Sequence, residues 1–124
     1  LLEKVQACPK VVAALKDKGF ASAEQALTGR TARVQGRSIR IGDVVLFSDG
    51  GEYTLVGEIY WFALVGSEFV VCLSSWPVLQ ICGRYRKVLV AENFDIIPSD
   101  RLRQAMIFTP AEMGKIATVI MLAL

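Results

Sequence analysis

The sequence contains no histidine, so it lacks the usual general base, the commonest metal ligand and the side chain that senses pH near neutrality. Cysteine is scarce as well. Cys8, Cys72 and Cys82 form no Cys-x-x-Cys pair, which excludes a disulfide scaffold and a four-ligand zinc site within one chain. We expect these thiols to be reduced and mostly buried, with a Cys72–Cys82 bridge across a hairpin as the alternative. Reduced thiols favour an intracellular protein.

Catalytic and cofactor motifs are also missing. No nucleophile with a base and no pair of carboxylates has recognisable catalytic spacing, and Gly50-Gly51 is typical of a turn rather than of a phosphate-binding loop. We therefore expect no enzyme activity, metal, cofactor or small-molecule substrate. Hydrophobic residues make up 53% of the chain and charged residues 21%, which excludes disorder and indicates apolar surface that meets a partner.

Uninterrupted apolar runs long enough to cross a bilayer are absent. Residues 59–83 carry one charge, Glu68, but Gly66, Pro77 and several serines divide this stretch into short β-like runs. Residues 1–30 contain no signal-peptide core, and the sequence begins with Leu1 rather than with a methionine. We expect a fragment of a larger protein that does not insert into a membrane.

Residues 1–36 are predicted to form an N-terminal helical hairpin. Proline is tolerated at the first position of a helix, so the first helix is expected to begin near Pro9 and to end at Gly19. Ser22-Ala23-Glu24-Gln25 has the form of a capping box, and Gly29 supplies a stop. These signals predict a second short helix.

Residues 37–124 are predicted to form a β-barrel-like domain that makes one compact unit with the hairpin. A change in apolar periodicity indicates a strand that ends at Phe47. Two long β-rich runs, 53–65 and 68–73, indicate strands joined by the tight turn Gly66-Ser67. Residues 86–91 form a fourth strand, and 116–124 a closing strand or a helix. Because residues 53–65 are apolar on both faces, we predict a mainly β fold, a small bent antiparallel β-barrel.

Three stretches of this β-rich segment have a recognisable pattern. Residues 41–46 place Gly-Asp before a strand, residues 56–61 place a small apolar step before Ile-Tyr-Trp, and residues 87–102 run from a strand through an acidic, aromatic loop into Ile-Pro. Over about residues 38–120 the chain resembles the bromo-adjacent homology (BAH) domain, a chromatin-associated module built on a bent β-barrel. It departs from that family at Cys72-Leu73-Ser74-Ser75, where a Trp-Phe pair is usual.

Four arginines, Arg30, Arg33, Arg37 and Arg40, lie in a stretch without an acid. Arginine holds phosphate through paired hydrogen bonds, so the cluster is a candidate contact for phosphate or for an acidic partner. The alternatives are that these arginines form a solvated linker surface, or that they pair with the five acids of residues 41–83, a segment without a base. The net charge of +2 is low for general nucleic-acid binding.

Aromatic residues form the second candidate site. Trp76 follows a strand beside Pro77, and Tyr85 lies between two arginines, so both are expected at the surface. Together with Tyr60 and Phe94 they are candidates for binding a cation or a peptide. Core packing gives the same alternation and is the alternative interpretation, which we favour for Trp61.

These features predict a non-catalytic interaction module. An aromatic rim near predicted loops at 75–85 and 93–99 would supply affinity, and the arginines would orient the partner. The resemblance implies that the partner is a histone tail or a chromatin-associated protein and that the compartment is the nucleus. A structural domain of a larger protein or assembly, and a small barrel that binds nucleic acid through the arginines, are the two alternatives.

Overall fold

The chain folds mainly as antiparallel β-sheet, in agreement with the sequence prediction. The structure, a computed structural model, describes residues 3–121, of which 55% are in strands and 13% are helical. The elements are β1 (Val5–Gln6), α1 (Pro9–Asp17), η1 (Ala23–Gln25), β2 (Leu27–Thr28), β3 (Thr31–Val34), β4 (Arg37–Arg40), β5 (Val44–Ser48), β6 (Thr54–Val65), β7 (Glu68–Trp76), β8 (Val78–Cys82), β9 (Tyr85–Leu89), β10 (Phe94–Pro98), η2 (Ser99–Arg101), β11 (Leu102–Phe108) and β12 (Ile116–Met121).

The N-terminal segment contains one α-helix rather than the predicted hairpin of two. α1 begins at Pro9, as the sequence predicts, and places Val11 and Leu15 against the sheet. The expected second helix is only the 3₁₀ turn η1, and the Ser22 side chain makes no capping hydrogen bond. The chain leaves the turn to form β2, which pairs with β1 and β6. Pairing with the sheet therefore outweighs the local helix signal.

The central strands agree with the sequence pattern. β5, β6 and β7 are consecutive antiparallel strands, and Val65 pairs with Glu68 across the two-residue turn. β9 and β12 confirm the strands predicted after residue 85 and after residue 115. The last three positions of that final predicted segment, 122–124, lie outside the described residues.

Two segments predicted as loops contain strands. β8 occupies much of residues 75–85 and pairs with β9, whereas β10 occupies most of residues 93–99 and pairs with β7. The prolines and glycines that suggested loops lie at the ends of these strands or on an edge strand. Proline is compatible with both positions because no ladder hydrogen bond is needed there.

A β-bulge in β6 interrupts the regular alternation of its side chains between the two faces of the sheet. Ile59 pairs with Leu73 and Trp61 pairs with Cys72, so Tyr60 has no partner of its own. The extra residue reverses the alternation, and Phe62 therefore lies in the same core cluster as Ile59. An alternation that continued without a bulge would place these two side chains on opposite faces.

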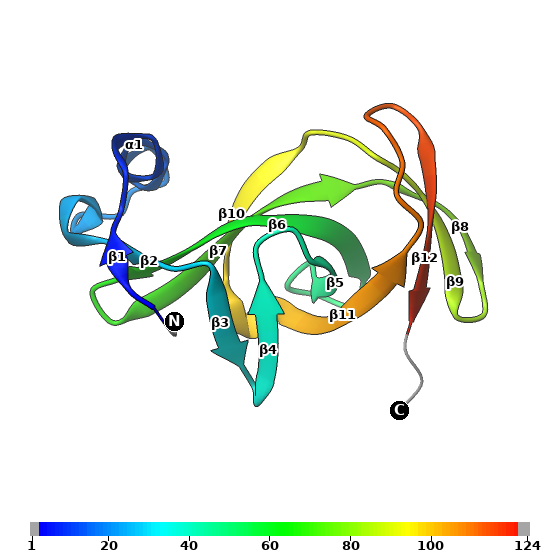
Figure 1. Cartoon of the computed structure of the whole chain (residues 1–124), viewed down its shortest axis with the longest axis horizontal. Coiled ribbons are helices and arrows are strands. Elements are labelled where there is room, and N and C mark those ends of the chain that lie inside the picture. The colour runs from blue at the N-terminus through cyan, green and yellow to red at the C-terminus, as the bar shows by residue number, and fades with distance from the viewer. Residues whose placement is uncertain (1–2, 122–124) are drawn as a thin grey trace.

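The sheet curves but is not closed into a barrel. Its strand order is β1-β2-β6-β5-β11-β12-β9-β8, with β7 paired to β6 and β10 paired to β7, and within residues 3–121 no pairing joins β8 to β10. Closure of the barrel is therefore unconfirmed. Two core clusters lie around Phe62 and around Trp76, and a third lies between α1 and the sheet. Figure 1 shows α1 at one end of the molecule and β8 and β9 at the other.

Candidate functional site

Tyr60 and Phe94 meet on the surface formed by β6, β7 and β10. Their ring centroids lie 4.6 Å apart with an interplanar angle of 86°, an edge-to-face arrangement. Phe94 pairs with Ser74 of β7, and Ser74 pairs with Glu58 of β6, so these three residues form one row across the strands. Cross-strand partners share a face, so Glu58 lies on the same face as Phe94, with Ser74 between them.

Two carboxylates lie near enough to the Tyr60 phenol for their charges to act on it. Burial raises the pKa of Glu58 above its ordinary value of 4.5. Burial also raises the pKa of Tyr60, and the negative charges of Glu58 and Glu92 raise it further. Within the described residues the two ion pairs are Lys16–Glu24 and Lys18–Asp95, so neither Glu58 nor Glu92 is neutralised there. The aromatic pair thus lies in a locally negative field.

The loop that carries Glu92 is held by Ser74. The buried Ser74 hydroxyl donates a hydrogen bond to the Ala91 carbonyl at 2.6 Å and accepts one from the Asn93 N–H at 3.0 Å. The Ser75 N–H donates to the Asn93 carbonyl at 2.9 Å. These bonds fix the backbone on both sides of Glu92 and set the position of Phe94, the next residue after Asn93.

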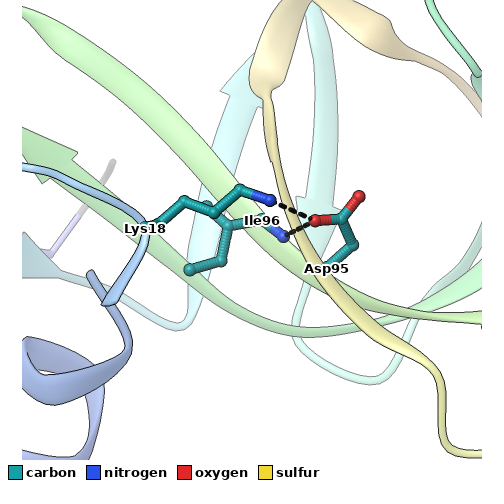
Figure 2. A network of polar contacts seen from close by, with 3 residues as sticks. All are labelled: Lys18, Asp95 and Ile96. Carbon is teal, nitrogen blue, oxygen red and sulfur yellow. Dashed lines mark hydrogen bonds and ion pairs between the residues drawn. The ribbon is translucent and has the colours of Figure 1, made fainter. Parts of the chain in front are cut away.

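An ion pair links the end of α1 to β10. Figure 2 shows the Asp95 carboxylate accepting hydrogen bonds from the Lys18 ammonium at 2.8 Å and from the Ile96 N–H at 2.9 Å. Both charged side chains are about half exposed, so the pair contributes little to stability. Within the described residues Asp95 therefore has an ion-pair partner, whereas Glu58 and Glu92 have none.

The other two aromatic candidates are not part of this site. Trp76 is 4% exposed and packs edge-to-face on Phe108, because its pairing with Val56 directs it into the core. The expectation that Trp76 is exposed is therefore wrong. Tyr85 is exposed, but it lies on β9 opposite Cys82 and Ile120.

The arginine cluster belongs to a two-stranded sheet of its own. In the β3–β4 hairpin Arg33 pairs with Ser38 and Arg40 pairs with Thr31, while the alternate residues Ala32, Val34 and Ile39 are buried. Arg33 and Arg40 therefore share the outer face with two hydroxyl side chains. Arg30 is also exposed and precedes β3.

One member of the cluster is already engaged. Arg37 donates a hydrogen bond to the Arg103 carbonyl at 2.6 Å, which ties the hairpin to β11. None of the four arginines forms an ion pair within residues 3–121, so the expected pairing with the acids of residues 41–83 is not observed there.

The cysteines differ from the sequence expectation. All three are free thiols, and Cys8 and Cys82 are exposed, so only Cys72 is buried as expected. Burial raises the pKa of the Cys72 thiol to about 11, and the charge of Asp95 contributes to this rise. Cys72 is therefore a packed, protonated thiol at neutral pH.

Sequence reasoning selected Tyr60 and Phe94 but not the carboxylates beside them. Glu58 was visible as a lone charge within an apolar strand, an unusual position for a residue without a role in binding or catalysis. Glu92 carried no such signal, because its place depends on the Ser74 contacts. The described part of the chain contains no group of three cysteine or acidic side chains arranged to hold a metal ion.

The comparisons identify no relative from which a function can be transferred. No protein-family model matches the sequence, and no curated protein matches it significantly. Among residues 3–121, no helix combines the length and the apolar character that crossing a membrane requires.

Proposed function

We propose that this chain is a non-catalytic interaction module that binds an extended basic peptide, such as a histone tail or a segment of a chromatin-associated protein. A lysine or arginine side chain of the peptide would lie against Tyr60 and Phe94, with Glu58 and Glu92 facing its charge. The observation that carries the proposal is the aromatic pair at 4.6 Å beside two carboxylates without an ion-pair partner in the described residues.

The energetics favour a cation at this position. A cation over an aromatic face gains about 0.5–2 kcal/mol, more when it loses water. The partly desolvated Glu58 carboxylate has lost some of its hydration, so a bound cation restores a favourable interaction to it. Such a site gives specificity for a positive side chain and modest affinity, as is common for modules that bind extended peptides.

The course of the sheet supports a bent barrel of the BAH type as part of this proposal. β8 follows β7 directly after Pro77, and the Leu89 N–H donates a hydrogen bond to the Pro77 carbonyl at 2.9 Å. β7 and β8 thus resemble a single bent strand that contributes to both ends of the curved sheet. A nuclear location follows from the same proposal.

The test is a binding comparison with matched aromatic variants. Histone-tail peptides are screened for retention, and the affinity of the best one is measured by fluorescence anisotropy. Phe94→Ala and Glu58→Gln are each expected to weaken binding about tenfold, because they remove the cation–π contact or the facing charge.

Tyr85→Ala is the control, since Tyr85 and Phe94 are both 53% exposed and Tyr85 lies on a strand outside the site. It should change the affinity by less than about twofold. Retention of no peptide would reject the proposal and favour a structural domain of a larger protein. An equal loss in all three variants would place the peptide elsewhere.

Nucleic-acid binding is a second candidate, favoured by the exposed outer face of the β3–β4 hairpin. Arg33 and Arg40 project there with Thr31 and Ser38 and have no ion-pair partner within residues 3–121. If this face binds phosphates, affinity for an RNA or DNA oligonucleotide falls steeply with salt. The double variant Arg33→Ala, Arg40→Ala should then reduce the slope of log affinity against log salt by the amount that corresponds to about two phosphate contacts. A flat salt dependence would reject this candidate.

A further inference from the structure

The edge strand β8 is an unusual feature of the sheet. It ends the strand order and, within residues 3–121, pairs with β9 alone, at the end of the molecule far from α1 (Figure 1). Four of its five residues are exposed, including Leu79 at 54% and Ile81 at 63%. An edge strand presents unpaired backbone N–H and C=O groups, so β8 combines free hydrogen-bonding groups with exposed apolar side chains.

The other ends of this sheet carry protecting features that β8 lacks, although a bulge interrupts β8. β1 has only two residues, and β10 carries Asp95 and Pro98. Short length, charge and proline are the usual means of blocking association at a sheet edge. Residues 78–82, Val-Leu-Gln-Ile-Cys, contain neither charge nor proline, and the one irregularity is a bulge between Val78 and Gln80.

The surroundings of β8 carry charge of one sign. Residues 69–91 contain no acid but include Arg84, Arg86 and Lys87. Arg84 lies in the β8–β9 turn, and Lys87 is exposed opposite Gln80. Two copies joined through β8 would bring these bases together without an acid from either strand to offset them. The charge pattern therefore disfavours self-association and favours an acidic partner.

We propose that β8 binds an extended acidic segment of a protein partner, which adds to the sheet as a further strand. Main-chain hydrogen bonds to the β8 edge supply affinity, and side-chain alternation supplies specificity. Gln80 and Lys87 share one face, whereas Ile81 lies on the other beside Arg86, whose part-buried guanidinium donates a hydrogen bond to the Met121 sulfur at 2.7 Å. The preferred segment therefore alternates carboxylates, which face Lys87 and Arg84, with aliphatic residues, which pack beside Ile81. This surface is distinct from the Tyr60–Phe94 site.

The experiment uses the whole chain and a labelled synthetic peptide in which glutamate alternates with isoleucine or valine. A lysine version of this peptide and a version with its apolar residues clustered are the peptide controls. The alternating acidic peptide is expected to bind at least about tenfold more tightly than either control. On binding, the backbone amides of β8 should become protected from hydrogen exchange.

Ile81→Lys places a charge on the edge and is expected to lower affinity for the acidic peptide about tenfold, even though lysine adds favourable charge, because it removes the apolar contact. Ile107→Lys is the matched control: Ile107 is 54% exposed and pairs with Ile120 of β12, on a strand that lies between β5 and β12 in the sheet order. It should leave affinity within about twofold of the original. Phe94→Ala should also have no effect, which separates this test from that of the basic-peptide site.

Three results would overturn the proposal. Equal binding of the acidic and lysine peptides would show that charge does not select the partner. An equal loss of affinity in Ile81→Lys and Ile107→Lys would show that the β8 edge is not the binding site. Sedimentation showing a dimer of the free chain that Ile81→Lys converts to a monomer would assign β8 to an interface between two copies.

Discussion

Replacing Phe62 with alanine is expected to lower the free energy of unfolding by about 3–5 kcal/mol, which is a large fraction of the stability of a domain of this size. The Phe62 ring is fully buried in the cluster with Ile59, Val71 and Leu73, and it packs on Phe69 at a centroid distance of 6.0 Å. Truncation leaves a cavity that strands paired on both sides cannot close. Urea denaturation followed by circular dichroism measures the change.

Phe94→Ala is the matched control for this truncation. Phe94 is 53% exposed, so its replacement should cost less than about 1 kcal/mol. The two variants are therefore expected to separate stability from binding, since Phe94→Ala should retain the fold and lose the peptide. A similar loss of stability in both would contradict the assignment of Phe62 to the core and Phe94 to the surface.

Gly57→Val is the second large destabilisation that we expect. A Cβ atom at Gly57 would lie 2.9 Å from the Ser74 carbonyl oxygen, 3.0 Å from the Phe47 ring and 3.2 Å from Leu73. The carbonyl belongs to the paired strand β7 and cannot move away as a flexible side chain can. Overpacking of this kind costs about 1–3 kcal/mol for Gly57→Ala, and valine is expected to exceed that range or prevent folding. Denaturation midpoints of both variants test this order.

Gly51→Ala serves as the comparison. Gly51 lies in the turn after β5, where an added Cβ would meet only an Asp49 carboxylate oxygen, at 3.4 Å. Its effect should stay within about 0.5 kcal/mol. If alanine at position 57 is tolerated as well as alanine at position 51, then β5, β6 and β7 do not approach one another as described.

The parts of the fold that sequence could predict are those set by neighbouring residues. Pro9 at the first helical position, the β-rich composition of residues 53–65 and the Gly66-Ser67 turn each act over a few residues, and α1, β6 and the β6–β7 hairpin appear where these signals place them. Local signals are sufficient when no distant partner competes with them.

The remaining elements depend on partners far along the chain. β10 forms because residues 94–98 pair with β7, and β2 replaces the second predicted helix because it pairs with β1 and β6. The bulge at Tyr60 was hidden because residues 53–65 are apolar on both faces, so a reversed alternation leaves no trace in the sequence.

The candidate site was only half predictable for the same reason. Tyr60 and Phe94 could be selected as aromatic residues near the rim. Their contact, however, depends on the pairing of β6 and β10 with β7, the strand that lies between them. Trp76 was selected by the same sequence criteria, but it is buried. Whether an aromatic residue faces solvent depended on strand register, which residue type and spacing do not specify.

The proposed role of Tyr60, Phe94 and Glu58 is to bind a positively charged side chain together. Its most direct test is an NMR titration of the isotope-labelled chain with a lysine-bearing histone-tail peptide and with the same peptide carrying a neutral residue in place of the lysine. We expect chemical-shift changes concentrated at these three residues and at Glu92, and lost with the neutral peptide. Changes confined to the β3–β4 hairpin, or equal changes with both peptides, would contradict the account.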